Sequence, residues 1–213
     1  MDAKDWDQRY AATELIWSAG PNQFVVSETS GLTPGTAFDM ACGEGRNAIW
    51  LAQQGWRATG ADFSAVAVEK ARTIAEREVG AGKHPVTWLQ ADATVTGPAA
   101  GSFDLVLLAY LQLPAPDRAA AVRLAAAGLA PGGHLLVIAH DSSNLAEGVG
   151  GPQYPEVLYT AEDVLSDLSD TIAAGQLKTL RAERVARTVL VDGAPRTAWD
   201  ALVHLAAHRD TAD

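Results

Sequence analysis

Between about residues 36 and 139, short apolar runs alternate with longer segments of helical character. Five of the apolar runs are predicted to be strands: Thr36–Met40, Arg57–Ala61, Val86–Gln90, Asp104–Ala109 and Leu135–Ala139. Helices are predicted over Asn47–Gln54, from the N-cap Ser64 to about Val79, and over Asp117–Leu129. Such alternation is typical of a parallel sheet with helices on both faces. The sequence therefore predicts an α/β fold.

The chain on either side of this core predicts further elements. Residues 4–18 have rough helical spacing, and Phe24–Thr29 follows as a second short helix. The stretch Asp141–Tyr159 is rich in Gly, Ser, Asn and Pro, which indicates a loop. A capping-box-like start at Thr160 predicts a helix to about Leu168. The last two predicted elements are antiparallel strands at the sheet edge, over Leu177–Val191 and Arg196–His208. Because no linker divides the chain, we expect residues 1–213 to form a single domain.

Composition disfavours several classes of partner. The chain has 16 Lys and Arg against 26 Asp and Glu, which gives a net charge of −10. Nucleic-acid affinity depends on cations that neutralise phosphates, so we expect neither nucleic acid nor an anionic membrane as partner. The single cysteine, Cys42, forms no internal disulfide or multi-cysteine zinc site, and no metal site is expected. The acidic N-terminus carries no signal-peptide pattern and no apolar run reaches roughly 20 residues, so we expect a cytoplasmic protein.

Glycines, carboxylates and aromatic or imidazole side chains follow the predicted strands at their carboxyl ends. Open α/β sheets bind their ligands at these ends. In strand order the segments are Asp39 with Gly43-Glu44-Gly45-Arg46, then Asp62-Phe63, Asp92-Ala93, Tyr110 and His140. The glycines let the backbone approach a ligand closely, although the loop alone also fits a loose dinucleotide fingerprint.

The carboxylates favour one ligand. Asp39 lies four residues before Gly43, where it would repel a pyrophosphate but attract the sulfonium and ammonium groups of S-adenosylmethionine (SAM). Asp62 can accept both ribose hydroxyls of either NAD or SAM. Asp92 can accept a hydrogen bond from the adenine amino group. An NAD(P)-dependent oxidoreductase is therefore the alternative enzyme, and a non-catalytic SAM-binding protein is the alternative outside catalysis.

Five ordered motifs resemble those of the class I SAM-dependent methyltransferases. They are Phe38-Asp39-Met40-Ala41-Cys42-Gly43-Glu44-Gly45, Gly60-Ala61-Asp62-Phe63-Ser64, Gln90-Ala91-Asp92-Ala93, Phe103-Asp104-Leu105-Val106 and Leu129-Ala130-Pro131-Gly132-Gly133. Two further segments, Trp6-Asp7-Gln8-Arg9-Tyr10 and Gly45-Arg46-Asn47-Ala48, are similar to small bacterial enzymes of the tellurite-resistance methyltransferase type. The resemblance implies a Rossmann-like, seven-stranded mixed sheet whose last strand is antiparallel. It also implies SAM as cofactor and S-adenosyl-L-homocysteine as product.

The resemblance also implies which residues hold the cofactor. The predicted cofactor-binding residues are Tyr10, Asp39, Gly43, Gly45, Arg46, Asp62, Phe63, Asp92, Ala93 and Ala109. Residues 1–30 would form a helical lid that brings Tyr10 near the methionine moiety. Arg46 is expected either to contact the cofactor carboxylate or to pair with Glu44. Phe63 would pack on the adenine face, and the Ala93 N–H would donate to a ring nitrogen.

The acceptor is expected to be a small molecule that presents a thiol, metalloid, phenol or heterocycle. His140, with Asp141 beside it, is the predicted general base, and Tyr110 is expected to contact the substrate or the sulfonium. The chain has Leu108-Ala109-Tyr110-Leu111 in place of the Asn/Asp-Pro-Pro-Tyr/Phe tetrapeptide that serves methylation of base amino groups and protein amides. Arginine is absent from Gly148–Tyr159, which disfavours tellurite itself. Tyr154 and Tyr159 either line the acceptor pocket or pack the loop.

Overall fold

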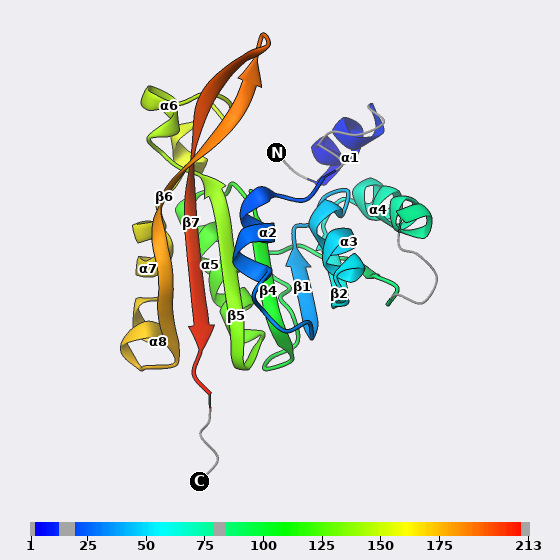
Figure 1. Cartoon of the computed structure of the whole chain (residues 1–213), viewed down its shortest axis with the longest axis vertical. Helices are drawn as coiled ribbons and strands as arrows, with labels where there is room; N and C mark the ends of the chain where they lie inside the picture. The colour runs from blue at the N-terminus through cyan, green and yellow to red at the C-terminus, as the bar shows by residue number, and fades with distance from the viewer. Residues whose placement is uncertain (1–2, 13–19, 79–83, 210–213) are drawn as a thin grey trace.

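The computed structural model describes residues 3–12, 20–78 and 84–209. These residues contain a seven-stranded sheet of order β3-β2-β1-β4-β5-β7-β6, in which β7 runs antiparallel to both neighbours (Figure 1). The strands are β1 Thr36–Met40, β2 Arg57–Asp62, β3 Thr87–Gln90, β4 Phe103–Ala109, β5 Leu129–His140, β6 Leu177–Val191 and β7 Ala194–Ala207. The predicted α/β fold with an antiparallel last strand is confirmed.

Helices cover both faces of the sheet. They are α1 Ala3–Ala11, α2 Gln23–Thr29, α3 Arg46–Gln53, α4 Ala65–Glu78, α5 Ala115–Ala127, α6 Asn144–Glu147, α7 Ala161–Asp167 and α8 Ser169–Ala173, with a 3-10 turn at Pro155–Val157. Strand β4 shows how one sequence builds two cores. Its residues Leu105 and Leu107 pack with α2 and α3, whereas Val106 and Leu108 pack with α5 and α7. Successive side chains of a strand point to opposite faces, so a strand buried on both faces reads as one apolar run.

Local side-chain bonds define where helices begin. Ser64 Oγ accepts a hydrogen bond from the Ala67 N–H at 3.1 Å, as expected of an N-cap. Thr160 and Asp163 form the predicted capping box at the start of α7. Asn22 caps α2 by accepting from the Phe24 N–H at 2.8 Å.

Some boundaries differ from the predictions. Strand β5 begins at Leu129 rather than at Leu135, because the Pro131-Gly132-Gly133 turn lies within the strand as an irregularity. Its pairing with β4 skips from Phe103–Leu129 to Leu105–His134. The predicted loop Asp141–Tyr159 contains α6 and the 3-10 turn, and α8 was not predicted. Part of the predicted N-terminal helix, residues 13–18, lies outside the described residues.

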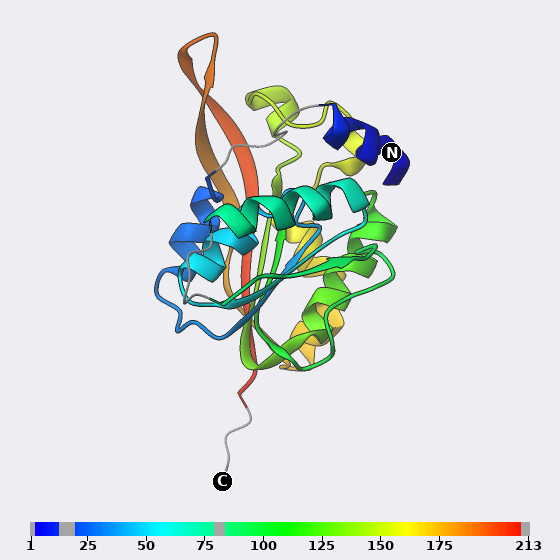
Figure 2. The same cartoon turned by 90° about the vertical axis from the view of Figure 1, so that its right-hand side faces the viewer.

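The predicted C-terminal hairpin is confirmed. Strand β7 inserts between β5 and the edge strand β6, and the far end of the hairpin projects beyond the body of the sheet (Figures 1 and 2). The antiparallel register pairs Ile138 with Leu202 and His140 with Asp200. The hairpin therefore brings residues near position 200 to the carboxyl end of β5.

Gly60 tests how tightly β2 packs against Trp88 of the neighbouring strand β3. A Cβ at Gly60 would lie 2.4 Å from Cζ3 of Trp88, its neighbour on β3. We expect Gly60→Ala to lower the free energy of unfolding by about 1–3 kcal/mol, because the tryptophan ring must move. The matched control is Gly31→Ala, since nothing lies within 4 Å of its added Cβ. Denaturant unfolding that gives equal stabilities for the two variants would contradict this packing.

Candidate active site

The loop between β1 and α3 is built on left-handed backbone conformations. Gly43 has a φ of 56° and Gly45 a φ of 81°, values that glycine adopts without steric cost. Ala41 also adopts a φ of 59° in spite of its Cβ, which is a strained conformation. Trp88 packs so closely against this loop that its Cη2 atom would clash with a Cβ at Gly45. The loop is thus a tight turn with little room for side chains on that face.

Asp62 joins the end of β2 to this loop. Its Oδ2 accepts the Gly43 N–H at 2.8 Å, and its Oδ1 accepts the Ser64 N–H at 2.9 Å. The carboxyl group is buried, which raises its pKa, while the two N–H groups act in the opposite direction. Asp62 therefore lies at its predicted position and also shapes the glycine loop.

Asp39 is the least compensated carboxylate at this edge. It is 1% exposed, and its Oδ2 accepts the Ala48 N–H at 3.2 Å. Its Oδ1 is buried and has no hydrogen-bond partner among the described residues. Burial raises the pKa of Asp39 to about 7, although the Ala48 N–H and Arg46 favour the charged form. A cation bound at this position would be attracted to a carboxylate oxygen that no described residue satisfies.

The third carboxylate follows β3, next to the end of β2. Asp62 pairs with Gln90 in the register, and Asp92 comes two residues later. Asp92 Oδ1 accepts from both the N–H and the hydroxyl of Thr94 at 2.8 Å. Ala93 is buried and Phe63 is half-buried at the same edge. The three carboxylates therefore come from three neighbouring strands.

Helix α1 is tied to the glycine loop through α4. Lys70 Nζ donates to the Tyr10 carbonyl at 2.6 Å and pairs with Glu44 at 3.2 Å. Tyr10 is buried, with its ring 5.5 Å from that of Trp6. The predicted contact of Tyr10 with the cofactor remains a prediction. Figure 2 shows α1 at the same end of the molecule as α6 and the projecting hairpin.

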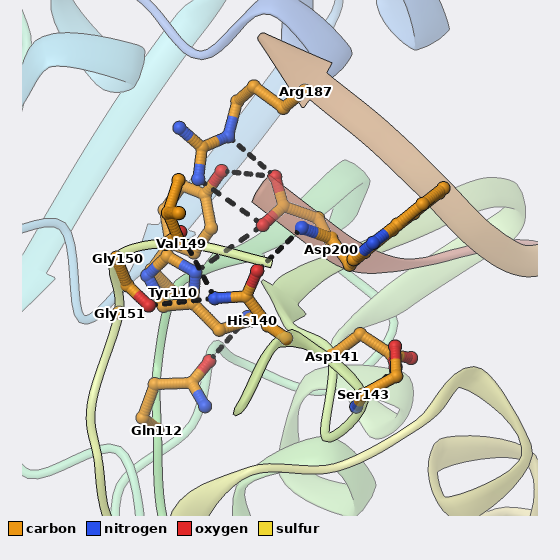
Figure 3. Close-up of polar contacts among 12 residues, drawn as sticks. Tyr110, Gln112, His140, Asp141, Ser143, Val149, Gly150, Gly151, Arg187 and Asp200 are labelled. Carbon is orange, nitrogen blue, oxygen red and sulfur yellow. Dashed lines mark hydrogen bonds and ion pairs between the residues drawn. The ribbon is translucent and has the colours of Figure 1, made fainter. Parts of the chain in front are cut away.

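A second group of polar side chains gathers where β4 and β5 end beside the middle of β7 and the neighbouring part of β6 (Figure 3). We call Tyr110, His140, Arg187 and Asp200 the Asp200 cluster. Asp200 is fully buried, and its Oδ2 accepts from the Tyr110 hydroxyl and from Arg187 Nε, both at 2.7 Å. Its Oδ1 lies 3.4 Å from Arg187 Nη2 and 3.4 Å from His140 Nδ1. One carboxylate thus contacts the other three members.

His140 has a different acidic neighbour from the one predicted. Asp141 Oδ1 accepts from the Ser143 N–H at 2.9 Å and from the Ser143 hydroxyl at 2.6 Å, so this carboxylate stabilises a local turn. The carboxylate at His140 is Asp200, its cross-strand partner. The imidazole also stacks on the Tyr110 ring, with centroids 4.6 Å apart and 28° between the planes. The prediction that Asp141 assists His140 is therefore corrected.

Electrostatics assign protonation states within the cluster. Burial raises the pKa of Tyr110 well above its usual value, and the Asp200 charge acts in the same direction. Burial alone would raise the pKa of Asp200, but the adjacent His140 imidazole and the hydrogen bonds from Arg187 and Tyr110 hold it below its usual value. Near neutral pH, Asp200 is a carboxylate and Tyr110 is a neutral hydroxyl donor.

Arg46 lies between the two groups of side chains. Its guanidinium is 5.9 Å from the Tyr110 ring centroid, while Arg187 approaches the same ring at 5.5 Å. Burial lowers the pKa of Arg46, although Tyr110 and Asp39 act in the opposite direction. Glu44, the alternative partner considered for Arg46, pairs with Lys70.

Sequence patterns did not identify Arg187 or Asp200 as site residues. The available signal was a single charge, Asp200, within the otherwise apolar end of the last strand. Tyr159 is buried in the core, where its hydroxyl donates to the Leu111 carbonyl at 2.9 Å. Tyr154 is 66% exposed, so neither tyrosine is enclosed in a pocket with the cluster. Ala109 is half-buried at the end of β4.

Comparison with known proteins agrees with this geometry. Residues 37–133 match the family described as a methyltransferase domain. The matched region includes the glycine loop, all three carboxylates and Tyr110, whereas His140, Arg187 and Asp200 lie outside it. No curated protein matches the chain in sequence.

Solved structures match almost the whole chain. The N-methyltransferase NodS of Bradyrhizobium japonicum, crystallised with S-adenosyl-L-homocysteine, has 18% identity and a TM-score of 0.70 over 97% of this chain and 99% of that chain. A protein studied for the conversion of a disulfide bond into a thioacetal group during echinomycin biosynthesis has 19% identity and a TM-score of 0.73 over 99% and 94%. The magnesium protoporphyrin IX methyltransferase of Synechocystis, with bound SAM, has 18% identity and a TM-score of 0.59 over 95% and 79%. These similarities establish the fold, a seven-stranded mixed sheet with helices on both faces and an antiparallel last strand.

Two further findings concern the described residues. No helix among them is both long and apolar enough to cross a bilayer. Within the same part of the chain, no three His, Cys, Asp or Glu side chains are grouped to hold a metal ion.

The raised pKa of Asp39 predicts a pH-dependent stability. Because the pKa of Asp39 in the folded chain, about 7, exceeds its ordinary value of 3.8, the stability that protonated Asp39 contributes is complete below about pH 4 and is lost as the pH rises to about 7. Because asparagine does not ionise, Asp39→Asn removes this loss of stability at high pH. Relative to the parent chain, its unfolding free energy should rise by up to about 4 kcal/mol between pH 4 and pH 8.

Denaturant unfolding at several pH values measures the effect. The matched control is Asp104→Asn, which lies at the start of β4 and so at the opposite end of the strands from Asp39. Hydrogen bonds from Thr36 lower the pKa of Asp104, so this variant should instead lose stability relative to the parent as the pH rises. A pH-independent difference between Asp39→Asn and the parent chain would show that the pKa of Asp39 does not change on folding, which would contradict this prediction.

Proposed function

We propose that this chain is a cytoplasmic enzyme that transfers a methyl group from SAM to a small-molecule acceptor and releases S-adenosyl-L-homocysteine. One observation carries the proposal. Asp39, Asp62 and Asp92 lie at three adjacent strand ends, next to a tight glycine loop that Asp62 holds, in the region that matches a methyltransferase domain. The Asp200 cluster lies at the carboxyl ends of β4 and β5, the strands that follow β1 in the sheet, where an acceptor would meet the cofactor.

The described residues fit the cofactor chemically. The partnerless Oδ1 of Asp39 would attract the cationic groups of SAM, and Asp62 would accept the ribose hydroxyls. Asp92, the Ala93 N–H and Phe63 would hold the adenine, while Tyr10 and Arg46 would contact the methionine moiety. Bound SAM supplies an electrophilic methyl group on a sulfonium. A pyrophosphate on this loop would instead lie near the Asp39 charge, which disfavours NAD(P).

The acceptor half would position the nucleophile. Methyl transfer is an in-line displacement, and orientation alone can supply roughly 7–11 kcal/mol. The Tyr110 hydroxyl is already bound to Asp200, so its ring face, rather than its oxygen, would contact the substrate. His140 would accept a proton from a phenol or a heterocyclic N–H, whereas a thiolate or metalloid would need little such help. The similar structures include an N-methyltransferase and a magnesium protoporphyrin IX methyltransferase, so the fold is compatible with different acceptors.

Substitution of Asp62 tests the cofactor site. We expect Asp62→Ala to weaken SAM binding by about 10-fold or more, because two ribose hydroxyls lose a charged acceptor. Isothermal titration calorimetry measures the affinity. Asp104→Ala, which removes a carboxylate from the opposite edge of the sheet, is the control. Because Asp62 also accepts two backbone N–H bonds, a melting curve of each variant separates unfolding from lost affinity. Unchanged SAM affinity in folded Asp62→Ala would contradict the proposed ribose contact.

Removal of His140 tests the acceptor site. We expect His140→Ala to lower turnover on phenolic and N–H acceptors by roughly 10²-fold or more and to leave SAM affinity unchanged. A panel of thiols, phenols and heterocycles, assayed for S-adenosyl-L-homocysteine release, supplies the measurement. His84→Ala, at an exposed residue before β3, is the control. Full activity of His140→Ala on every accepted substrate would remove His140 as the base.

A further inference from the structure

The orientation of His140 is fixed from several sides. Its backbone N–H donates to Gln112 Oε1 at 2.8 Å, and one face of its ring stacks on Tyr110. A Cβ at Gly151 would lie 2.8–3.0 Å from the imidazole atoms Cγ, Cδ2 and Nδ1, so the loop backbone packs directly against the ring. Asn144 holds that loop by donating to the carbonyls of Val149 and Gly150. The imidazole therefore has little freedom to rotate.

The two ring nitrogens of His140 lie in different environments. Nδ1 is buried, forms no hydrogen bond of ordinary geometry with the described residues, and lies 3.4 Å from Asp200 Oδ1. The side chain as a whole is still 15% exposed. Since Nδ1 is enclosed, Nε2 is the nitrogen that a substrate can reach.

Arg187 allows Asp200 to stay charged while fully buried. An isolated buried carboxylate is costly, but Arg187 donates to both of its oxygens and Tyr110 donates to Oδ2. Both short bonds, at 2.7 Å, converge on Oδ2. They fix the rotation of the carboxyl group and leave Oδ1 as the oxygen that faces His140.

We propose that Asp200 and Arg187 are positioning residues that hold His140 as the Nδ1–H tautomer, with Nε2 as the proton acceptor for a weakly acidic N–H or O–H of the methyl acceptor. This inference rests on the proposed methyl transfer. In the methyl transfer, the acceptor atom forms a bond to the methyl carbon and the C–S bond of the sulfonium breaks. The electron pair of the broken bond stays on sulfur. The acceptor proton passes to Nε2, and Asp200 stabilises the resulting imidazolium. The substrate class is thus a phenol or a heterocyclic N–H rather than a thiol, which ionises without such assistance.

Asp200→Asn distinguishes a positioning role from a structural one. Tyr110 and Arg187 are both donors at one oxygen, so the asparagine oxygen must take that place and its NH₂ group must face His140 Nδ1. The NH₂ group would then donate to Nδ1 and convert His140 to the Nε2–H tautomer, which cannot accept the proton.

Nitrogen-15 NMR of histidine-labelled protein reads the tautomer without any acceptor, and the spectrum of His140→Gln assigns the signal. We expect neutral His140 to be the Nδ1–H tautomer in the parent chain and the Nε2–H tautomer in Asp200→Asn. The Nε2–H tautomer in the parent chain would overturn the proposal, whether or not the variant folds. An unchanged tautomer in folded Asp200→Asn would also overturn it.

Kinetics add a second readout. Turnover on an accepted phenol or N–H compound should fall by roughly 10²–10⁴-fold in Asp200→Asn, with the KM for SAM unchanged. Gly151→Ala should lower the same rate because its Cβ displaces the imidazole. Gly150→Ala is a closely matched control, since its φ of 76° resembles the 74° of Gly151 but nothing lies within 4 Å of its Cβ. Equal rates for these two glycine variants would overturn the proposed role of ring position. Calorimetry that shows no SAM binding would instead refute the proposed function, while the tautomer result would stand on its own.

Discussion

The register of the strands at their carboxyl ends is the constraint on which both halves of the site depend. Parallel pairing aligns Asp39 with Gly60 and Asp62 with Gln90, which brings the β1–β3 carboxylates to one edge. Antiparallel pairing places Asp200 opposite His140. A slip of one residue in either pairing would turn a carboxylate to the other face of the sheet. The two apolar cores oppose such a slip, because it would move every side chain of the strand to the opposite face and so disrupt the packing on both faces.

The same burial makes a buried carboxylate costly, and Asp39, Asp62 and Asp200 are compensated to different degrees. Asp62 accepts two backbone N–H bonds, and Asp200 is neutralised by Arg187. Asp39 has one oxygen that no described residue satisfies. The uneven compensation suggests separate tasks, since a satisfied carboxylate orients its neighbours whereas an unsatisfied one attracts a cation. On this account Asp39 favours the charge of the cofactor, and Asp200 orients a proton acceptor.

Local patterns were sufficient to predict most of the fold and to place the glycine loop and three carboxylates at neighbouring strand ends. The glycine loop, Asp39, Asp62 and Asp92 each follow a strand whose apolar run is visible in the sequence. The acceptor half depends on a contact between residues 60 positions apart, His140 and Asp200, which no local pattern encodes. Asp141, the nearest carboxylate in sequence, was therefore assigned to His140 although it turns toward Ser143. The irregularity of β5 at Pro131–Gly133 was likewise hidden, because it depends on pairing with β4.

The central claim is that the carboxyl edge of the sheet binds SAM, and a thermal-shift titration with SAM, S-adenosyl-L-homocysteine and NADH tests it most directly. At about 100 times Kd, a ligand that binds only the folded chain stabilises it by about 2.7 kcal/mol. For a chain of this size that corresponds to a rise in Tm of roughly 5–10 °C. The account predicts such a rise with the two adenosyl ligands and not with NADH. No rise with either adenosyl ligand, or an equal rise with NADH, would contradict it.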